Sequence, residues 1–177
     1  MSMTSSPPVA LRAHRWLFQQ KTQWCGAAVA VGIHAFYSAT PGHSLAGSGL
    51  YAQCTVMESA SSLPVAAGAC CGGTSPCNAP ADVFLALGFV GCAGQSLPHH
   101  LQPPVITTEL SSGRPIGCIL TPAGGGPQHA VIVTGYDAAS GQLSLFDPWL
   151  GPRRVPLQGL QLGWLTTGTW RATVLTV

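Results

Sequence analysis

The feature that most constrains the fold is the run from Trp24 to Tyr37, WCGAAVAVGIHAFY, in which nearly every residue is apolar or small. The run ends at SATPG, where Pro41 and Gly42 are typical of a turn. A helix that is apolar on all of its sides has to be covered by other elements. The sequence therefore predicts a buried helix near the N-terminus, with the rest of the chain packed around it.

Shorter helices and then strands are expected after this run. The patterns favour helices over residues 49–59, 78–87 and 105–112, with Asn78 as the N-cap of the second and Gly113 at C′ of the last. Beyond these come RPIGCIL, QHAVIVTGYD, GQLSLFDPW and GTWRATVLTV, which are short β-branched and apolar runs separated by turn residues. Helices in the first two thirds and an antiparallel sheet in the last third make an α+β fold.

The length of 177 residues suits one domain with a single core, and no internal repeat or domain boundary is visible. We expect residues 13–177 to form this domain. Residues 1–12 are rich in Ser and Pro at their start and are expected to be a flexible N-terminal segment.

The scarcity of charge limits the possible partners. Charged residues make up 7% of the chain, and the seven Lys and Arg residues form no basic stripe that could bind a row of phosphates, so no nucleic-acid partner is expected. The one local pair, Arg153 and Arg154, is interpreted as solvated surface. No apolar stretch reaches the about 20 residues that cross a bilayer, so no membrane partner is expected. The oligomeric state stays open.

Neither the N-terminus nor the cysteines decide the compartment. The first residues lack the apolar region of a classical signal peptide, which leaves the cytoplasm or a non-classical secretion route. Five cysteines, apart from Cys25 and Cys118, could either form disulfides or remain reduced thiols in the core, and the sequence favours neither state. They are Cys54, Cys70, Cys71, Cys77 and Cys92. Their C-C-x5-C spacing lacks the paired C-x2-C of structural zinc sites, so we expect no metal and no cofactor.

Cys25 lies where the buried helix is expected to start. A thiol attacks as its thiolate, and a helix N-terminus favours that negative charge. Acyl transfer also needs hydrogen-bond donors for the oxyanion. The Cys25 N–H and the side-chain amide of Gln19, six residues upstream, are the expected donors, with Gln20 and Gln23 as alternatives to Gln19.

A cysteine nucleophile needs a base and a group that orients the base. Among the histidines, His129 stands apart because it opens a strand directly after the loop TPAGGGPQ. Asp147 closes the next strand, and in an antiparallel hairpin the start of one strand lies beside the end of the other. His129 and Asp147 are therefore expected to meet.

These residues, in this order, form a pattern that resembles a known family. The spacing Q-x5-C before a buried helix, the QWC at Cys25, and the segments HAVIVTGYD and LFDPW are similar to the papain-like cysteine peptidases. The resemblance is greatest to the compact bacterial branch that includes C39-type and effector proteases, and it covers about residues 16–150. The plant and lysosomal C-G-[SA]-C-[WY] signature is absent, and Gly26 stands where this branch often has Trp, so no substrate preference is carried over.

The resemblance implies a papain-like fold, in which the helix bearing the nucleophile packs on a C-terminal antiparallel sheet, and a peptide or protein substrate. Cys25 would be the nucleophile, and His129 the general base and then acid. Asp147 would orient His129, Gln19 would donate to the oxyanion, and Trp149 would shield the His–Asp hydrogen bond. The expected reaction is peptide-bond hydrolysis through a thioester acyl-enzyme. The same residues would serve an acyltransferase or deamidase, and a catalytically inactive peptide-binding module is the third alternative.

Overall fold

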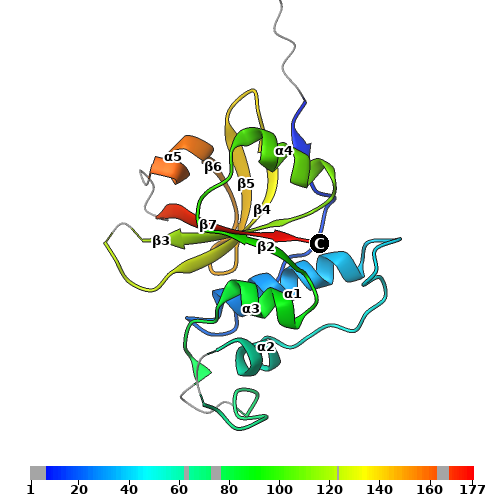
Figure 1. The fold of residues 1–177 in the computed structure, drawn as a ribbon, viewed down its shortest axis with the longest axis vertical. Coiled ribbons are helices and arrows are strands. Elements are labelled where there is room, and N and C mark those ends of the chain that lie inside the picture. The colour runs from blue at the N-terminus through cyan, green and yellow to red at the C-terminus, as the bar shows by residue number, and fades with distance from the viewer. Residues whose placement is uncertain (1–6, 62–63, 73–76, 123, 163–167) are drawn as a thin grey trace, which may run out of the picture.

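A computed structural model describes residues 7–61, 64–72, 77–122, 124–162 and 168–177, and its fold is α+β (Figure 1). The helices are α1 Cys25–Ser38, α2 Gln53–Ala60, α3 Val83–Phe89, α4 Pro103–Ser111 and α5 Leu157–Leu162. The strands are β1 Val9–Ala10, β2 Ala93–Leu97, β3 Ile116–Thr121, β4 His129–Asp137, β5 Gln142–Asp147, β6 Gly151–Pro156 and β7 Thr169–Thr176.

The apolar run forms α1, and every residue from Cys25 to Tyr37 is buried, which confirms the predicted buried helix. The helix packs against α2, α3 and the sheet, and all three surround it with apolar side chains. His34, the one ionisable imidazole inside this helix, is buried and pairs through Nδ1 with the hydroxyl of Ser38 at 3.3 Å.

The strands pair antiparallel in the order β2-β7-β3-β4-β5-β6, and β1 pairs with the far end of β4. Helices α1, α2 and α3 lie on one side of the sheet, and α4 and α5 lie on the other (Figure 1). Side chains of a strand alternate between faces. Along β4, Ala130 and Ile132 pack with α1, whereas Val131 and Val133 join the second core cluster. Two covered faces explain why this strand is continuously apolar from Ala130 to Val133.

The predicted division into helical first two thirds and a sheet in the last third was wrong in part. Strand β2 lies in the region predicted to be helical and pairs with β7. Strand β1 contains Val9 and Ala10, which were assigned to the flexible segment. Val9 pairs with Tyr136 and Ala10 with Gly135. Residues 1–6 of that segment lie outside the described residues. Strand β6 and helix α5 were not predicted. The β2 sequence AGQSL has no β-branched residue and β6 contains two prolines, so local propensity indicates neither strand.

The helix expected to begin at Asn78 begins at Val83 instead. Its N-cap is Asp82, whose carboxylate accepts a hydrogen bond from the Leu85 N–H at 2.9 Å. The side-chain Oδ1 of Asn78 accepts from the Gln23 N–H at 3.1 Å and so connects to the loop before α1. Both residues are good N-caps by type, and only the tertiary contact of Asn78 distinguishes them.

The remaining helices are present with shifted ends, α2 beginning at Gln53 and α4 at Pro103. Gly113 has a φ of +74°, and its N–H donates to the carbonyl of Leu110, so its predicted role at C′ is confirmed. Of the helices in the described ranges, none has the length and apolar character needed to span a bilayer.

The structure decides the state of the cysteines. Disulfides join Cys54 to Cys71 and Cys70 to Cys77, while Cys25, Cys92 and Cys118 are free and buried. The disulfide alternative therefore holds for four of these cysteines, the reduced alternative holds for Cys92, and Cys118 is buried in the core. In the part of the chain that is described, no group of three His, Cys, Asp or Glu side chains could hold a metal ion.

Candidate active site

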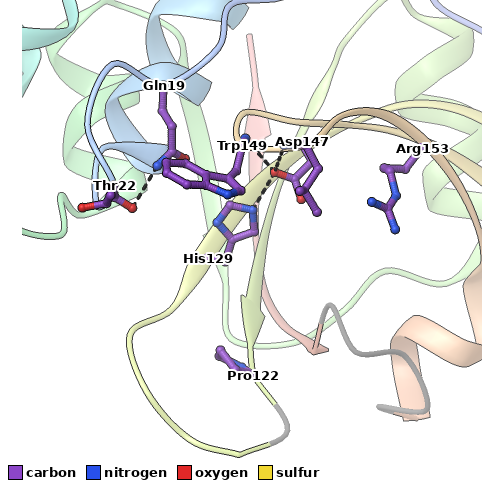
Figure 2. A pocket seen from close by; sticks show the side chains of 8 residues that line it. Gln19, Thr22, Pro122, His129, Asp147, Trp149 and Arg153 are labelled. Atoms are coloured by element: carbon purple, nitrogen blue, oxygen red, sulfur yellow. Dashed lines mark hydrogen bonds and ion pairs between the residues drawn. The ribbon is translucent and has the colours of Figure 1, made fainter.

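The three residues predicted to form a nucleophilic site lie together, although they come from three different elements. Cys25 is the first residue of α1, His129 the first of β4 and Asp147 the last of β5. His129 Nε2 lies 2.9 Å from Asp147 Oδ1 (Figure 2), and the Cys25 and His129 side chains line the same small cavity, where His129 lowers the pKa of the thiol. Because Asp147 occupies Nε2, Nδ1 is the ring nitrogen available to the thiol.

The register of β4 and β5 explains the contact between His129 and Asp147. Ile132 pairs with Phe146, and continuing the pairing places Asp147 opposite Val131, one diagonal step from His129. Diagonal neighbours on one face are within reach of long or aromatic side chains. The hairpin therefore sets this half of the site by itself, as the sequence predicted.

The Asp147 carboxylate is held by more than His129. Its Oδ1 also accepts hydrogen bonds from the N–H groups of Trp149 at 2.8 Å and Leu150 at 3.2 Å, and the residue is buried. Burial raises the pKa of the carboxyl group, but the His129 side chain and these two N–H groups outweigh burial, so the pKa is lowered. Asp147 is thus a fixed anion behind the imidazole.

The electrostatics favour a thiolate and an imidazolium. Burial raises the pKa of the Cys25 thiol, but hydrogen bonds from His129 and from backbone N–H groups lower it, and the net shift is downward. Burial lowers the pKa of His129, yet Asp147 and Cys25 raise it to about 9. Each group stabilises the charge of the other, as a nucleophile and base require.

The other two free thiols behave in the opposite way. Burial raises the pKa of Cys92 to about 12 and that of Cys118 well above its ordinary value, and neither has a compensating cation. All of the chain's cysteines lie in the described ranges. Cys25 is therefore the one free thiol whose surroundings lower its pKa.

Gln19 lies beside this group, but its amide is occupied. Its backbone N–H donates to the Pro148 carbonyl at 2.9 Å, which places it next to Asp147. Its Nε2 donates to the carbonyls of Lys21 at 2.8 Å and Thr22 at 2.9 Å, and the Oε1 is buried without a hydrogen-bond partner (Figure 2). The residue is in the predicted place, and its role as an oxyanion donor stays a prediction.

Gln53, at the start of α2, is a residue that the sequence interpretation missed. It is only 4% exposed, its Nε2 donates to the Phe18 carbonyl at 2.7 Å, and its Oε1 accepts from the Gln20 N–H at 2.9 Å. One side-chain amide therefore holds the backbone on both sides of Gln19. No local sequence signal indicates this contact, because Gln53 lies far along the chain from the segment that it binds.

Two cavities meet at His129. The larger, of about 370 Å³, is lined by Gln19, Thr22, Pro122, His129, Asp147, Trp149, Leu150 and Arg153. The smaller, of about 70 Å³, is bordered by Cys25, His129 and mostly apolar neighbours from residues 80–83 and 119. A substrate lying across the site would thus pass over the imidazole between the two.

Two further predicted features have structural counterparts. The Trp149 side chain lines the larger cavity beside His129 and Asp147, but it is 54% exposed, and its shielding role stays a prediction (Figure 2). Gly26 faces the backbone carbonyl of Ala81, which would lie 2.8 Å from an added Cβ. A side chain directly after Cys25 would require this carbonyl to shift.

Comparison with known proteins gives one match to a family model and a structural match of low similarity. A family model described as Peptidase_C70, papain-like cysteine protease AvrRpt2, matches residues 10–161. Among solved structures, the Pseudomonas avirulence protein AvrPphB matches with 14% sequence identity and a TM-score of 0.31, over 53% of this chain and 57% of that one. No curated protein matches the sequence. The match of the family model covers most of the chain.

Proposed function

This chain belongs to the Peptidase_C70 family of AvrRpt2-type papain-like cysteine proteases, and on that premise we propose that it hydrolyses a peptide bond with Cys25, His129 and Asp147. The observation that carries the proposal is the 2.9 Å hydrogen bond between His129 and Asp147 beside the cavity that His129 shares with the Cys25 thiol. Family membership establishes a cysteine protease, and the roles of individual residues are our proposal.

In the first step, the Cys25 thiolate forms a bond from Sγ to the carbonyl carbon of the substrate, and the carbonyl electrons move onto oxygen. The raised pKa of His129 keeps the imidazolium beside the sulfur at neutral pH. Asp147 fixes the ring orientation through Nε2 and stabilises its positive charge.

The tetrahedral oxyanion needs donors close to the sulfur. We propose the backbone N–H of Cys25, at the start of α1, together with the amide of Gln19. Both N–H bonds of Gln19 Nε2 are directed at carbonyls in this structure. One of these bonds therefore has to be shared or released when the oxyanion forms.

Collapse of the intermediate breaks the C–N bond, and the proton on His129 Nδ1 passes to the leaving amine, which leaves a thioester on Cys25. His129, now neutral, takes a proton from water while the water oxygen attacks the thioester carbon. Release of the acid restores the thiolate and the imidazolium. No other reactant is required.

Labelling with the epoxide E-64 followed by mass spectrometry tests the nucleophile. We expect one adduct on wild type and on Cys92→Ala, which removes another buried free thiol, and none on Cys25→Ala. Equal labelling of the Cys25 variant would refute the assignment.

A synthetic peptide library incubated with wild type then identifies the reaction. Hydrolysis gives two fragments, acyl transfer gives a gain in mass, and deamidation gives a shift of about one mass unit. A protein that labels at Cys25 but changes no peptide would contradict the proposed hydrolysis.

A further inference from the structure

A positive charge without an internal partner lies in the larger cavity. Arg153, on β6, lines this cavity together with His129, Asp147 and Trp149. Figure 2 shows Gln19 and Arg153 on opposite sides of the His129–Asp147 pair. Arg153 is exposed, as the sequence interpretation expected, and it also lines the cavity beside His129 and Asp147.

Each acidic side chain of the protein has a hydrogen-bond or ion-pair partner other than Arg153, including Asp147 in the same cavity. The chain has five, and all lie in the described ranges. Glu58 accepts from the N–H groups of residues 68, 70 and 71, and Asp82 accepts from the Leu85 N–H. Glu109 pairs with Arg114, and Asp137 interacts with Ser140 and Arg154. Asp147 pairs with His129. Within these ranges Arg153 forms no ion pair.

The neighbouring arginine provides a contrast. Successive side chains of a strand point to opposite faces. Arg154 is 3.8 Å from the Asp137 carboxylate and does not line the cavity, whereas Arg153 lines the cavity and has no carboxylate. The two adjacent residues have the same charge and are both exposed, and only Arg153 lines the cavity.

We propose that Arg153 is a specificity residue that binds a carboxylate of the substrate in this cavity, which rests on the proposed peptidase activity. A guanidinium pairs with a carboxylate through two parallel N–H donors. The apolar side chains of Pro122, Trp149 and Leu150 line the same cavity and reduce the water around such a pair. The carboxylate is either an acidic side chain near the cleaved bond or the C-terminal carboxylate of a short peptide.

Cleavage of a synthetic peptide library, quantified by mass spectrometry, tests this specificity. One copy of the library has free C-termini and the other has amidated C-termini. We expect wild type to favour peptides with Asp or Glu at one position near the cut, or to favour the free C-termini, and either result identifies the source of the carboxylate. Arg153→Ala should reduce that preference roughly ten-fold, and Arg153→Glu should invert it toward Lys and Arg.

Arg154→Ala is the matched control and should keep the wild-type preference, because its side chain faces Asp137. Raising the salt concentration should weaken the preference of wild type but not of Arg153→Ala. Wild type that cleaves peptides without a carboxylate preference, or an Arg153→Ala variant that keeps it, would overturn the proposal and leave the peptidase activity standing. Wild type that is neither labelled by E-64 nor cleaves any peptide would overturn both.

Discussion

Replacing Gln53 by Leu tests whether a buried amide outside the cleft positions Gln19. The change removes the hydrogen bonds to the Phe18 carbonyl and the Gln20 N–H and keeps a side chain of similar size. Each such bond contributes about 0.5–1.5 kcal/mol net. Phe18 and Gln20 are both exposed, so water can replace part of the loss. We expect unfolding to become easier by about 1–2 kcal/mol, which lowers Tm by about 2–8 °C for a chain of this size.

The effect on activity should be larger than this stability loss implies. Misplacing a reacting group by about 1 Å can cost about 100-fold, and removing an oxyanion donor costs about 100- to 1,000-fold in kcat. We therefore expect Gln53→Leu to lower kcat about 10- to 100-fold with a small change in KM, measured well below the Tm of the variant. Gln19→Ala should lower kcat further, and its Tm should fall by a comparable amount because it also removes two side-chain hydrogen bonds.

A double-mutant cycle separates positioning from general destabilisation. If Gln53 acts through Gln19, the double variant should have the kcat of Gln19→Ala, because the second change removes nothing further. Gln161 donates from its side chain to the Leu101 carbonyl in a part of the protein that does not line the cleft, so Gln161→Leu is the control and should affect Tm alone. Losses in kcat that multiply in the double variant, or full activity in Gln53→Leu, would refute the reasoning.

Further predictions concern pH, the crosslinks and the residue after the nucleophile. Because the active ion pair requires protonated His129, whose pKa is about 9, kcat/KM should fall as the pH rises through about 9. Asp147→Ala should move this alkaline limb to lower pH, since the carboxylate raises that pKa, and an unmoved limb would contradict the assignment. Replacing both Cys70 and Cys77 by Ser removes their disulfide and should lower the free energy of unfolding by about 2.5 kcal/mol, because the unfolded chain gains loop entropy. An unchanged Tm in thermal denaturation would show that this disulfide does not stabilise the fold. Gly26→Ala should lower the free energy of unfolding by about 1–3 kcal/mol, because the Ala81 carbonyl that faces Gly26 has to move to make room for a Cβ. An unchanged midpoint in chemical denaturation would show that this carbonyl moves without cost.

Much of the site follows from short-range patterns in the sequence. The composition of residues 24–37 predicts α1 because an all-apolar run has one stable environment, the interior. The hairpin that joins His129 to Asp147 is also local, since a short turn and strand alternation bring the two together. The start of α3 was misplaced for the opposite reason, because Asn78 and Asp82 are equivalent as N-caps until tertiary contacts assign one of them elsewhere.

The sequence by itself determined which elements carry the proposed nucleophile and the proposed base, and that the first element is buried while the second is a strand that begins at His129. Only the tertiary structure decided that the Cys25 thiol meets His129, that Gln53 holds the backbone around Gln19, and that Arg153 rather than Arg154 faces the cavity. Local propensity acts between near neighbours along the chain, whereas these contacts join distant segments. They form because the burial of α1 against the sheet fixes where each of those segments can lie.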